Sequence, residues 1–247
     1  MTRTARATNR AGWLLAAVVV LVLVLVGCGG AAVAPTATPS PDLTPAQILE
    51  RTSRRLAETP TVHFELKVDG DTFVDSGNTI RLLTASGDLQ RPDRVVTTFK
   101  VEVVGRTVSL QLITIGDTSW VTNILTGAWG PAPPEFQYQP TVLFDNQNGI
   151  GPVMGRVSDL SRLPDEEIDG RRVYRLQAQV DQDVIGPLTY YTIKGSPVTV
   201  DLWVDQQTDD LLRASMSEAP AADRPHPATW TLDLSRQGDK VSIEPPV

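Results

Sequence analysis

The side chain that most clearly indicates a chemical role is the thiol of Cys28, the only cysteine in the 247-residue chain. A single cysteine has no partner for an intrachain disulfide, so its use lies in the nucleophilicity of the thiolate. Residues 25–28 read "LVGC" and match the bacterial lipobox, in which the thiol receives a diacylglycerol before the chain is cut. We therefore expect Cys28 to be lipidated and to become the first residue of the mature chain.

The segment before Cys28 has the composition of a secretory signal. Arg3, Arg6 and Arg10 provide positive charge, and residues 13–26 form an uncharged apolar run. This run is shorter than the roughly 20 residues of a membrane-spanning helix. Residues 1–27 are therefore expected to be a lipoprotein signal peptide that is removed. The alternative is an uncleaved signal anchor that keeps an unmodified cysteine.

Residues 28–42 are expected to comprise the lipidated cysteine and a flexible spacer. The sequence "GGAAVAPTATPSPD" contains small residues, prolines and threonines without an apolar period, a composition that is typical of unfolded linkers. Two acyl chains hold a protein on a bilayer much more firmly than one. These features predict a protein that is lipid-anchored at the extracytoplasmic face of the cell membrane.

The remaining reactive side chains do not form a recognisable catalytic or metal-binding pattern. His63 lies on the polar face of a predicted strand, and His226 stands between two prolines. The carboxylates of residues 165–169 form a charge run beside a turn, which is typical of a solvated loop. The sequence contains no H-E-x-x-H, G-x-S-x-G or phosphate-loop pattern. We therefore expect no enzyme activity, no metal and no cofactor.

The charge balance of the chain excludes a further class of partner. Loss of the signal peptide removes three arginines from 22 basic residues and leaves 19 against 29 acidic ones, a formal charge of −10. An acidic protein of this kind is a poor candidate for binding nucleic acid through bulk charge. The roughly 200 residues after the spacer suit a single domain, which we place at residues 43–247.

The first part of this domain reads as one helix followed by strands. Thr44 is a candidate N-cap, Pro45 occupies the first helical position, and Ile48, Leu49, Leu56 and Ala57 share a stripe, which predicts a helix over 45–58. Apolar side chains then alternate with polar ones in three further segments, which predicts strands. These segments are residues 62–68, 94–103 and 108–112, with a further strand through Trp120.

Alternation also marks the second part of the domain. Strands are expected within residues 171–180, 197–205 and 211–217, and on both sides of a turn at Gln237 and Gly238. A weaker helical region falls between residues 140 and 160. About ten strands with few helices predict an α+β, mostly β fold, in which a curved antiparallel half-barrel sheet has helices covering its concave apolar face.

Three segments resemble a known family of lipoproteins. Together with the lipobox and the spacer, "TPAQILERTSRRLAETPTVHFELKVDG", "GDLQRPDRV" and "LDLSRQGDKVSIEPPV" are similar to the LppX/LprG (LppX_LprAFG) family of lipid-carrying lipoproteins, and more distantly to the LolA/LolB carriers. The resemblance implies a half-open β-barrel closed by helices, with an apolar cavity for the acyl chains of a lipid or glycolipid. It also implies transfer of that lipid across the cell envelope, with a membrane lipid transporter as a possible partner.

The apolar faces of the predicted strands provide candidates for lining such a cavity. The candidates are Phe64, Leu66, Val68, Phe99, Val101, Leu110, Leu112, Tyr174, Leu176, Leu202 and Leu232. From periodicity alone, plain core packing is the better explanation for any single one of these residues, and only the family resemblance supports the set as cavity walls, so a second interpretation stays open. In that interpretation the fold is a packed, non-catalytic module that senses or scaffolds other envelope proteins. Trp129 and the Pro- and Ala-rich run at 217–228 are candidates for the rim of an opening.

Overall fold

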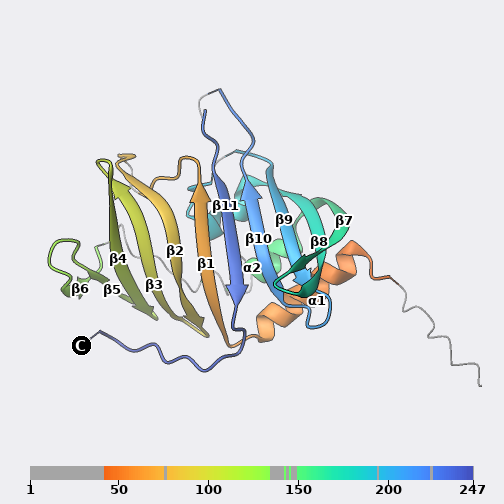
Figure 1. Ribbon diagram of the computed structural model, residues 1–247, viewed down its shortest axis with the longest axis horizontal. Helices are drawn as coiled ribbons and strands as arrows, with labels where there is room; N and C mark the ends of the chain where they lie inside the picture. Colours follow the sequence, from red (N-terminus) through yellow and green to blue (C-terminus); the bar gives the residue numbers. More distant parts are fainter. Residues whose placement is uncertain are drawn as a thin grey trace, which may run out of the picture. The chain divides into compact units, whose positions relative to one another are not determined.

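Strands dominate the part of the chain that the computed structural model describes, which comprises residues 42–74, 77–133, 142, 145, 149–193, 195–222 and 225–246 (Figure 1). The expectations for residues 1–41, including Cys28 and the signal peptide, lie outside these residues. Residues Leu43–Val247 form one compact unit of the chain.

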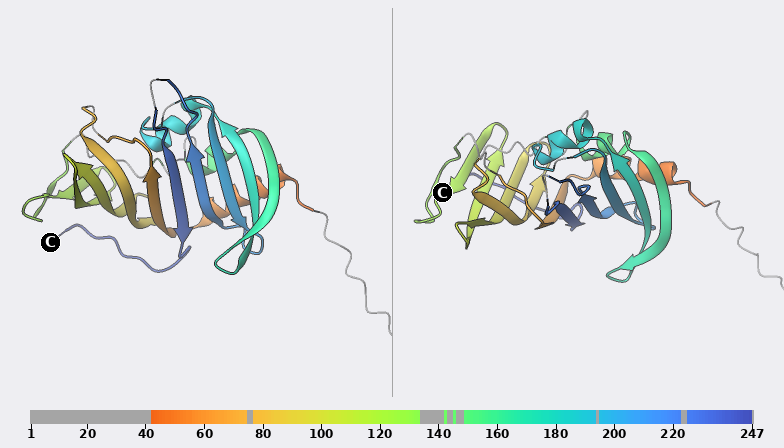
Figure 2. Two further views of the ribbon diagram at one scale, coloured as in Figure 1. Left: turned by 45° about the horizontal axis from the view of Figure 1, so that its top comes forward. Right: turned by 90° about the horizontal axis from the view of Figure 1, so that it is seen from above.

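Eleven strands form one antiparallel sheet in the order β6-β5-β4-β3-β2-β1-β11-β10-β9-β8-β7. The strands are β1 Thr61–Asp69, β2 Ile80–Gln90, β3 Arg94–Val103, β4 Arg106–Ile115, β5 Thr118–Thr122, β6 Trp129–Pro131, β7 Ser158–Ile168, β8 Arg171–Val180, β9 Val198–Asp205, β10 Leu211–Ser217 and β11 Thr229–Ser235. Two meanders, β1 to β6 and β7 to β11, join where β1 pairs with β11. The sheet is strongly curved, and β6 and β7 are its two edges (Figure 2). The predicted half-barrel fold is confirmed.

Helix α1, Pro45–Glu58, has the predicted bounds and begins with a capping box. The backbone N–H of Gln47 donates to Thr44 Oγ1 (3.3 Å), and the backbone N–H of Thr44 donates to Gln47 Oε1 (2.9 Å). These two bonds satisfy N–H groups that the first turn of a helix leaves without partners. Proline at the first position adds a preset φ angle. The sequence signals therefore determine where the helix starts.

The buried stripe of α1 differs from the prediction at one position. Ile48, Leu49 and Leu56 are buried as expected, but Ala57 is exposed and Thr52 is fully buried instead. A buried hydroxyl needs a partner, and Thr52 Oγ1 donates to the carbonyl oxygen of Ile48 (2.9 Å). The threonine therefore takes an apolar position because its own helix satisfies its hydroxyl.

Helices α2, Ile150–Met154, and α3, Gln182–Thr189, lie with α1 on the concave side of the sheet (Figure 2). Helix α2 lies within the predicted helical region and contacts both α1 and α3. Helix α3 connects the neighbouring strands β8 and β9. Because the chain connections supply these helices, the concave face is covered without a separate domain.

The apolar interior forms two clusters. The larger cluster joins α1, α2 and α3 mainly to β8, β9 and β10, and it also takes in Val62, Leu89 and Val95 of the N-terminal meander. The smaller cluster joins β1 to β4 and includes Val68 and Leu82. The described helices therefore pack chiefly against the C-terminal meander.

Strand β2 was not predicted, because a bulge interrupts its alternation. The pairing of β2 with β3 shifts register between Leu82 and Thr84. Leu82 lies before the shift and has an even residue number, whereas Ala85 and Leu89 lie after it and have odd numbers. All three are nevertheless buried on the same face. A bulge adds one residue to one strand and bends it. It thus keeps the apolar side chains on one face while the sheet curves.

Two further expectations were wrong. The described residues 239–246 form no strand, although the alternation after Gly238 predicted one. The carboxylates of residues 165–167 lie in β7 and not in a loop, and the hairpin turn begins only at Asp169 and Gly170, with φ angles of 50° and 77°. None of the β7 residues is buried, and its pairing with β8 shifts register twice, so β7 left no periodic apolar signal in the sequence.

Candidate functional site

A cavity of about 370 Å³ lies between the concave face of the sheet and the helices. Both meanders contribute to its walls, through strands β1 to β4 and β8 to β11. The helical side is supplied by Leu56 of α1, by Val153 and Met154 of α2, and by Ile185 and Leu188 of α3. The space therefore spans the line where β1 and β11 join the two halves of the sheet.

The walls of the cavity are almost entirely apolar. No charged side chain is among the described residues that line it, and the polar atoms belong to Thr97, Thr189, Thr192, Tyr190 and Trp230. The indole N–H of Trp230 donates to Thr72 Oγ1 (3.1 Å), and the hydroxyl of Thr189 donates to the carbonyl oxygen of Ile185 (3.3 Å). Since Trp230 and Thr189 already have partners and most of the lining is hydrocarbon, the cavity suits an acyl chain rather than a charged ligand.

Most of the predicted candidates reach the cavity. Those that line it are Phe64, Leu66, Phe99, Val101, Leu110, Leu112, Leu202 and Leu232. Strand periodicity places side chains on the correct face, but it does not indicate how far along the strand the hollow extends. The set therefore combines cavity walls with ordinary core.

The other three candidates lie outside the lining. Val68 is buried in the smaller cluster, and Leu176 is fully buried in the larger one. Tyr174 packs at the edge of the larger cluster, where the guanidinium of Arg162 lies 4.8 Å from its ring centroid. These three residues therefore pack the core around the cavity rather than its walls.

Sequence reasoning missed the contribution of α3 and of the turn after it. The cavity lining includes Ile185, Leu188 and Thr189 of α3, and Tyr190 and Thr192 of the turn. Gly186 and Pro187 have the lowest helix propensities of all residues, so the local sequence gives only a weak indication of a helix here. The available signal was Asp181 at the N-cap position with Asp183 in the first turn, a pattern that favours a helix start.

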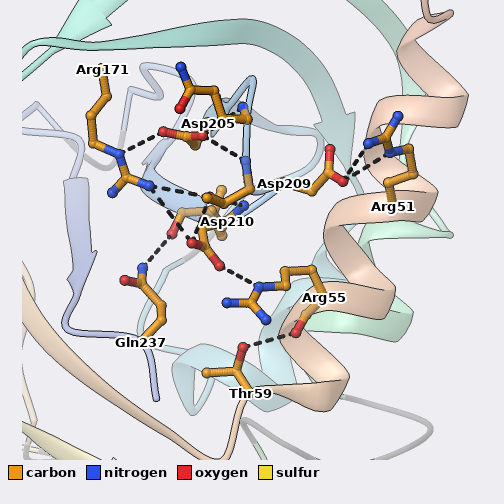
Figure 3. A network of polar contacts seen from close by, with 11 residues as sticks. Arg51, Arg55, Thr59, Arg171, Asp205, Asp209, Asp210 and Gln237 are labelled. Atoms are coloured by element: carbon orange, nitrogen blue, oxygen red, sulfur yellow. Dashed lines mark hydrogen bonds and ion pairs between the residues drawn. The ribbon is translucent and has the colours of Figure 1, made fainter. Parts of the chain in front are cut away.

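A polar network holds α1 against the turn between β9 and β10 (Figure 3). Arg51 donates from Nε and Nη2 to Asp209 Oδ2 (2.9 and 2.7 Å), and Arg55 Nε donates to Asp210 Oδ1 (2.7 Å). On the opposite side, the hydroxyl of Thr208 donates to Asp210 Oδ2 (2.7 Å). The network fixes the helix that supplies Leu56 to the cavity.

Asp205 anchors the same turn from the end of β9. Its Oδ1 accepts the backbone N–H groups of Gln207 (2.7 Å) and Thr208 (2.8 Å), and its Oδ2 accepts Arg171 Nε (2.6 Å). Burial alone would raise the pKa of Asp205. The bonds from Thr208, Gln207 and Arg171 outweigh that effect and hold the pKa below its ordinary value. The carboxylate is therefore charged and structural.

The other titratable groups considered in the sequence lie away from the cavity. His63 Nδ1 is 2.8 Å from Asp88 Oδ1, and His226 is exposed. The indole N–H of Trp203 donates to Glu166 Oε2 (2.8 Å) and, together with Arg175, lowers the pKa of that carboxyl. Across the described part of the chain, no three His, Cys, Asp or Glu side chains lie close enough to hold a metal ion.

The two candidate rim segments also lie outside the cavity lining. Trp129 is in β6, opposite Thr122 of β5. Residues 218–228 connect β10 to β11, and within the described part of this connection Glu218 Oε2 accepts the backbone N–H of Ala228 (3.0 Å). No helix in the described part of the chain has the length and hydropathy needed to cross a membrane.

Comparison with solved structures finds the same fold in mycobacterial lipoproteins. LprF from Mycobacterium bovis is 19% identical, with a TM-score of 0.64 over 82% of this chain and 96% of the other. LppX from Mycobacterium tuberculosis is 15% identical, with a TM-score of 0.59 over 81% and 98% of the two chains. A LolA superfamily protein from Nitrosomonas europaea is a more remote match, 12% identical over 81% and 96%, with a TM-score of 0.28.

Comparison with curated proteins gives no match. Comparison with protein families does: the family described as LppX_LprAFG lipoprotein matches residues 44–243, which include every described helix and strand. This is a family of lipoproteins. The chain therefore belongs to the LppX_LprAFG lipoprotein family.

Proposed function

We propose that this protein binds an acylated lipid or glycolipid in its cavity and transfers it across the cell envelope while it is tethered to the membrane through Cys28. The observation that carries the proposal is the uncharged, apolar cavity of about 370 Å³ between sheet and helices. Small-molecule sites typically occupy about 300–1,000 Å³. The family membership supports a lipid as the ligand, because the resemblance of the sequence implies a lipid carrier.

The chemistry of acyl chains explains why such a cavity is useful. Exposure of an acyl chain to water costs about 0.8 kcal/mol per methylene, so a chain of about 14 methylenes costs roughly 11 kcal/mol. A carrier must replace the bilayer interior with an equally apolar surface. Walls such as Phe99, Leu112 and Leu232 provide that surface without a polar group that would lose its hydration.

The cost of leaving the space empty points in the same direction. Unfilled apolar volume destabilises a core, because the residues that line it lose dispersion contacts, and this cavity measures about 370 Å³. Whole domains are stable by only about 5–15 kcal/mol. Chains that fill the cavity would restore dispersion contacts that a packed core has from the start.

The tether explains how the domain would reach its donor membrane. Residues 29–42 separate Cys28 from the compact unit. Fourteen residues at about 3.6 Å each extend to roughly 50 Å. The lipidated cysteine would therefore hold the cavity close to the membrane from which the lipid is taken.

Native mass spectrometry of residues 43–247, purified from a lipid-rich host, tests the proposal. We expect a stoichiometric lipid adduct that organic extraction removes and identifies. Ala85→Phe and Ala214→Phe place a ring in the cavity, because both alanines are buried in its wall. We expect each variant to lower lipid occupancy at least tenfold.

A matched control separates cavity filling from the substitution itself. Ala57→Phe makes the same change on the exposed side of α1 and should leave occupancy unchanged. Ala85→Leu is a milder filling variant in case the larger ring prevents folding. A wild-type domain that stays empty after incubation with phospholipid vesicles, or filled variants that retain full occupancy, would overturn the proposal.

A further inference from the structure

The turn that follows α3 lies at the mouth of the cavity. Tyr190 is the only exposed residue among the described residues that line the cavity, with 49% of its surface accessible. The next residue, Tyr191, is 57% exposed. A side chain that contacts both the cavity and solvent marks an opening, so the two tyrosines stand beside the opening.

The backbone of this turn has an unusual conformation. Tyr190 and Tyr191 have φ angles of 50° and 55°, the left-handed region that side chains other than glycine rarely adopt. The backbone N–H of Tyr191 donates to the carbonyl oxygen of Gly186 (2.9 Å). A Cβ atom at Gly186 would lie 2.3 Å from Tyr191 Cε1, so the ring packs directly against the glycine. The contact with Gly186 therefore fixes where Tyr191 lies against α3, while both tyrosines stay partly exposed.

The segment that contains the pair is uncharged between Asp183 and Lys194. Residues 184–193 contain no charged side chain, whereas the chain without residues 1–27 has a formal charge of −10. An acidic protein is repelled by anionic lipid headgroups, so contact with a bilayer requires a neutral surface. Tyrosine has an apolar ring with a polar tip and is enriched at the boundary between headgroups and acyl chains.

We infer that Tyr190 and Tyr191 form a surface that docks onto the lipid bilayer and brings the mouth of the cavity against it. This inference rests on the proposed lipid-carrier function and specifies how the lipid enters. An acyl chain that passed through water would lose the protection of the bilayer before it reached the cavity. Direct contact between mouth and bilayer removes that exposure, and the 14-residue spacer keeps the two within roughly 50 Å.

Vesicle binding by residues 43–247 tests the inference, since this unit contains both core clusters. The variant Tyr190→Asn/Tyr191→Asn removes the rings but suits the backbone, because asparagine tolerates left-handed φ angles. We expect at least tenfold weaker cosedimentation with vesicles of phosphatidylethanolamine and phosphatidylglycerol (3:1), and at least fivefold slower lipid extraction. The variant Tyr190→Trp/Tyr191→Trp should retain both.

Val104→Asn is the matched control. Val104 is 91% exposed with a φ angle of 49°, but lies in the β3–β4 turn and not in the cavity lining. We expect it to behave as wild type. If Val104→Asn weakens binding equally, or if the tyrosine variant binds and extracts as wild type does, the inference is wrong.

A separate measurement distinguishes failure of docking from failure of the carrier proposal. Lipid supplied in detergent micelles bypasses the bilayer, so occupancy measured by native mass spectrometry should be the same for wild type and for the single variant Tyr191→Asn, because Tyr191 does not line the cavity. If the wild-type cavity is fully occupied but the tyrosine-to-asparagine variant binds vesicles as wild type does, docking is wrong and the carrier proposal stands. An empty wild-type cavity under these conditions would overturn the carrier function on which docking depends.

Discussion

Three carboxylates in one turn show how neighbouring residues of the same type take different roles. Asp205 accepts two backbone N–H groups and Arg171, whereas Asp209 and Asp210 accept arginines from α1. The partners of Asp209 and Asp210 lie 158 and 155 residues away in sequence. No local pattern could therefore predict these contacts, which depend on how the sheet brings β9 and β10 beneath the helix.

Asp205→Asn should destabilise the protein in a pH-dependent way. The folded pKa of Asp205 is lowered, so its contribution is complete above its unfolded pKa of about 3.9 and is lost as pH falls through the lower folded value. At pH 7 we expect a loss of about 1.5–3 kcal/mol, as for hydrogen bonds to charged groups. Urea unfolding from pH 7 to pH 2 measures the difference, which should narrow in acid.

Asp69→Asn is the control for this experiment. Asp69 is 61% exposed and pairs with Lys67 on the surface, so its loss should cost less than about 0.5 kcal/mol. A difference between wild type and Asp205→Asn that stays constant below pH 4 would contradict the role assigned to the charged carboxylate.

Among the elements, α1 could be predicted from local chemistry and α3 could not. Thr44, Gln47 and Pro45 determine the start of α1 within its own first turn. Helix α3 contains Gly186 and Pro187, so its helical form depends on packing of Ile185 against the sheet. Strand β2 was missed because its bulge interrupts the alternation, whereas β1 and β3 keep a clean period of two.

The position of α1 should depend on the two of its three arginines that bind the β9–β10 turn, Arg51 and Arg55. Arg55→Met removes the charged hydrogen bond to Asp210, which is largely buried, so we expect a loss of about 1.5–3 kcal/mol in unfolding free energy. Amide protons in the last turn of α1 should exchange faster by hydrogen-exchange mass spectrometry. Arg54→Met, on the exposed side of the same helix, is the control and should change neither quantity. Equal effects of the two variants would argue against the network as the anchor of α1.

At the scale of the whole unit, the cavity follows from the way the two meanders meet. The described helices pack mainly on the C-terminal meander, while the smaller cluster lies on the N-terminal one. The cavity lies across both and takes walls from each. Alternation in the sequence indicated which side chains face inward, but the hollow depends on the separation between helices and sheet, which no single segment encodes.

Bound lipid should stabilise the unit as a whole. Ligand at 100 times its dissociation constant adds about 2.7 kcal/mol, and 1 kcal/mol shifts the Tm of a domain of this size by about 2–4 °C. We therefore expect delipidation to lower the Tm by about 5–11 °C in differential scanning calorimetry. The filled variant Ala85→Phe should show no such shift, and a wild-type Tm that delipidation leaves unchanged would contradict the prediction.

The open sheet also has a consequence for assembly with other chains. An unclosed sheet exposes backbone donors and acceptors at its edges, which can template intermolecular β-pairing and aggregation. Edge strand β7 includes Pro164, the charged residues 165–167 and two register shifts in its pairing with β8. Proline removes a donor, charges repel a second copy, and bulges twist the edge away from a partner strand. The half-barrel can thus stay open along this edge without offering a ready template for fibre growth.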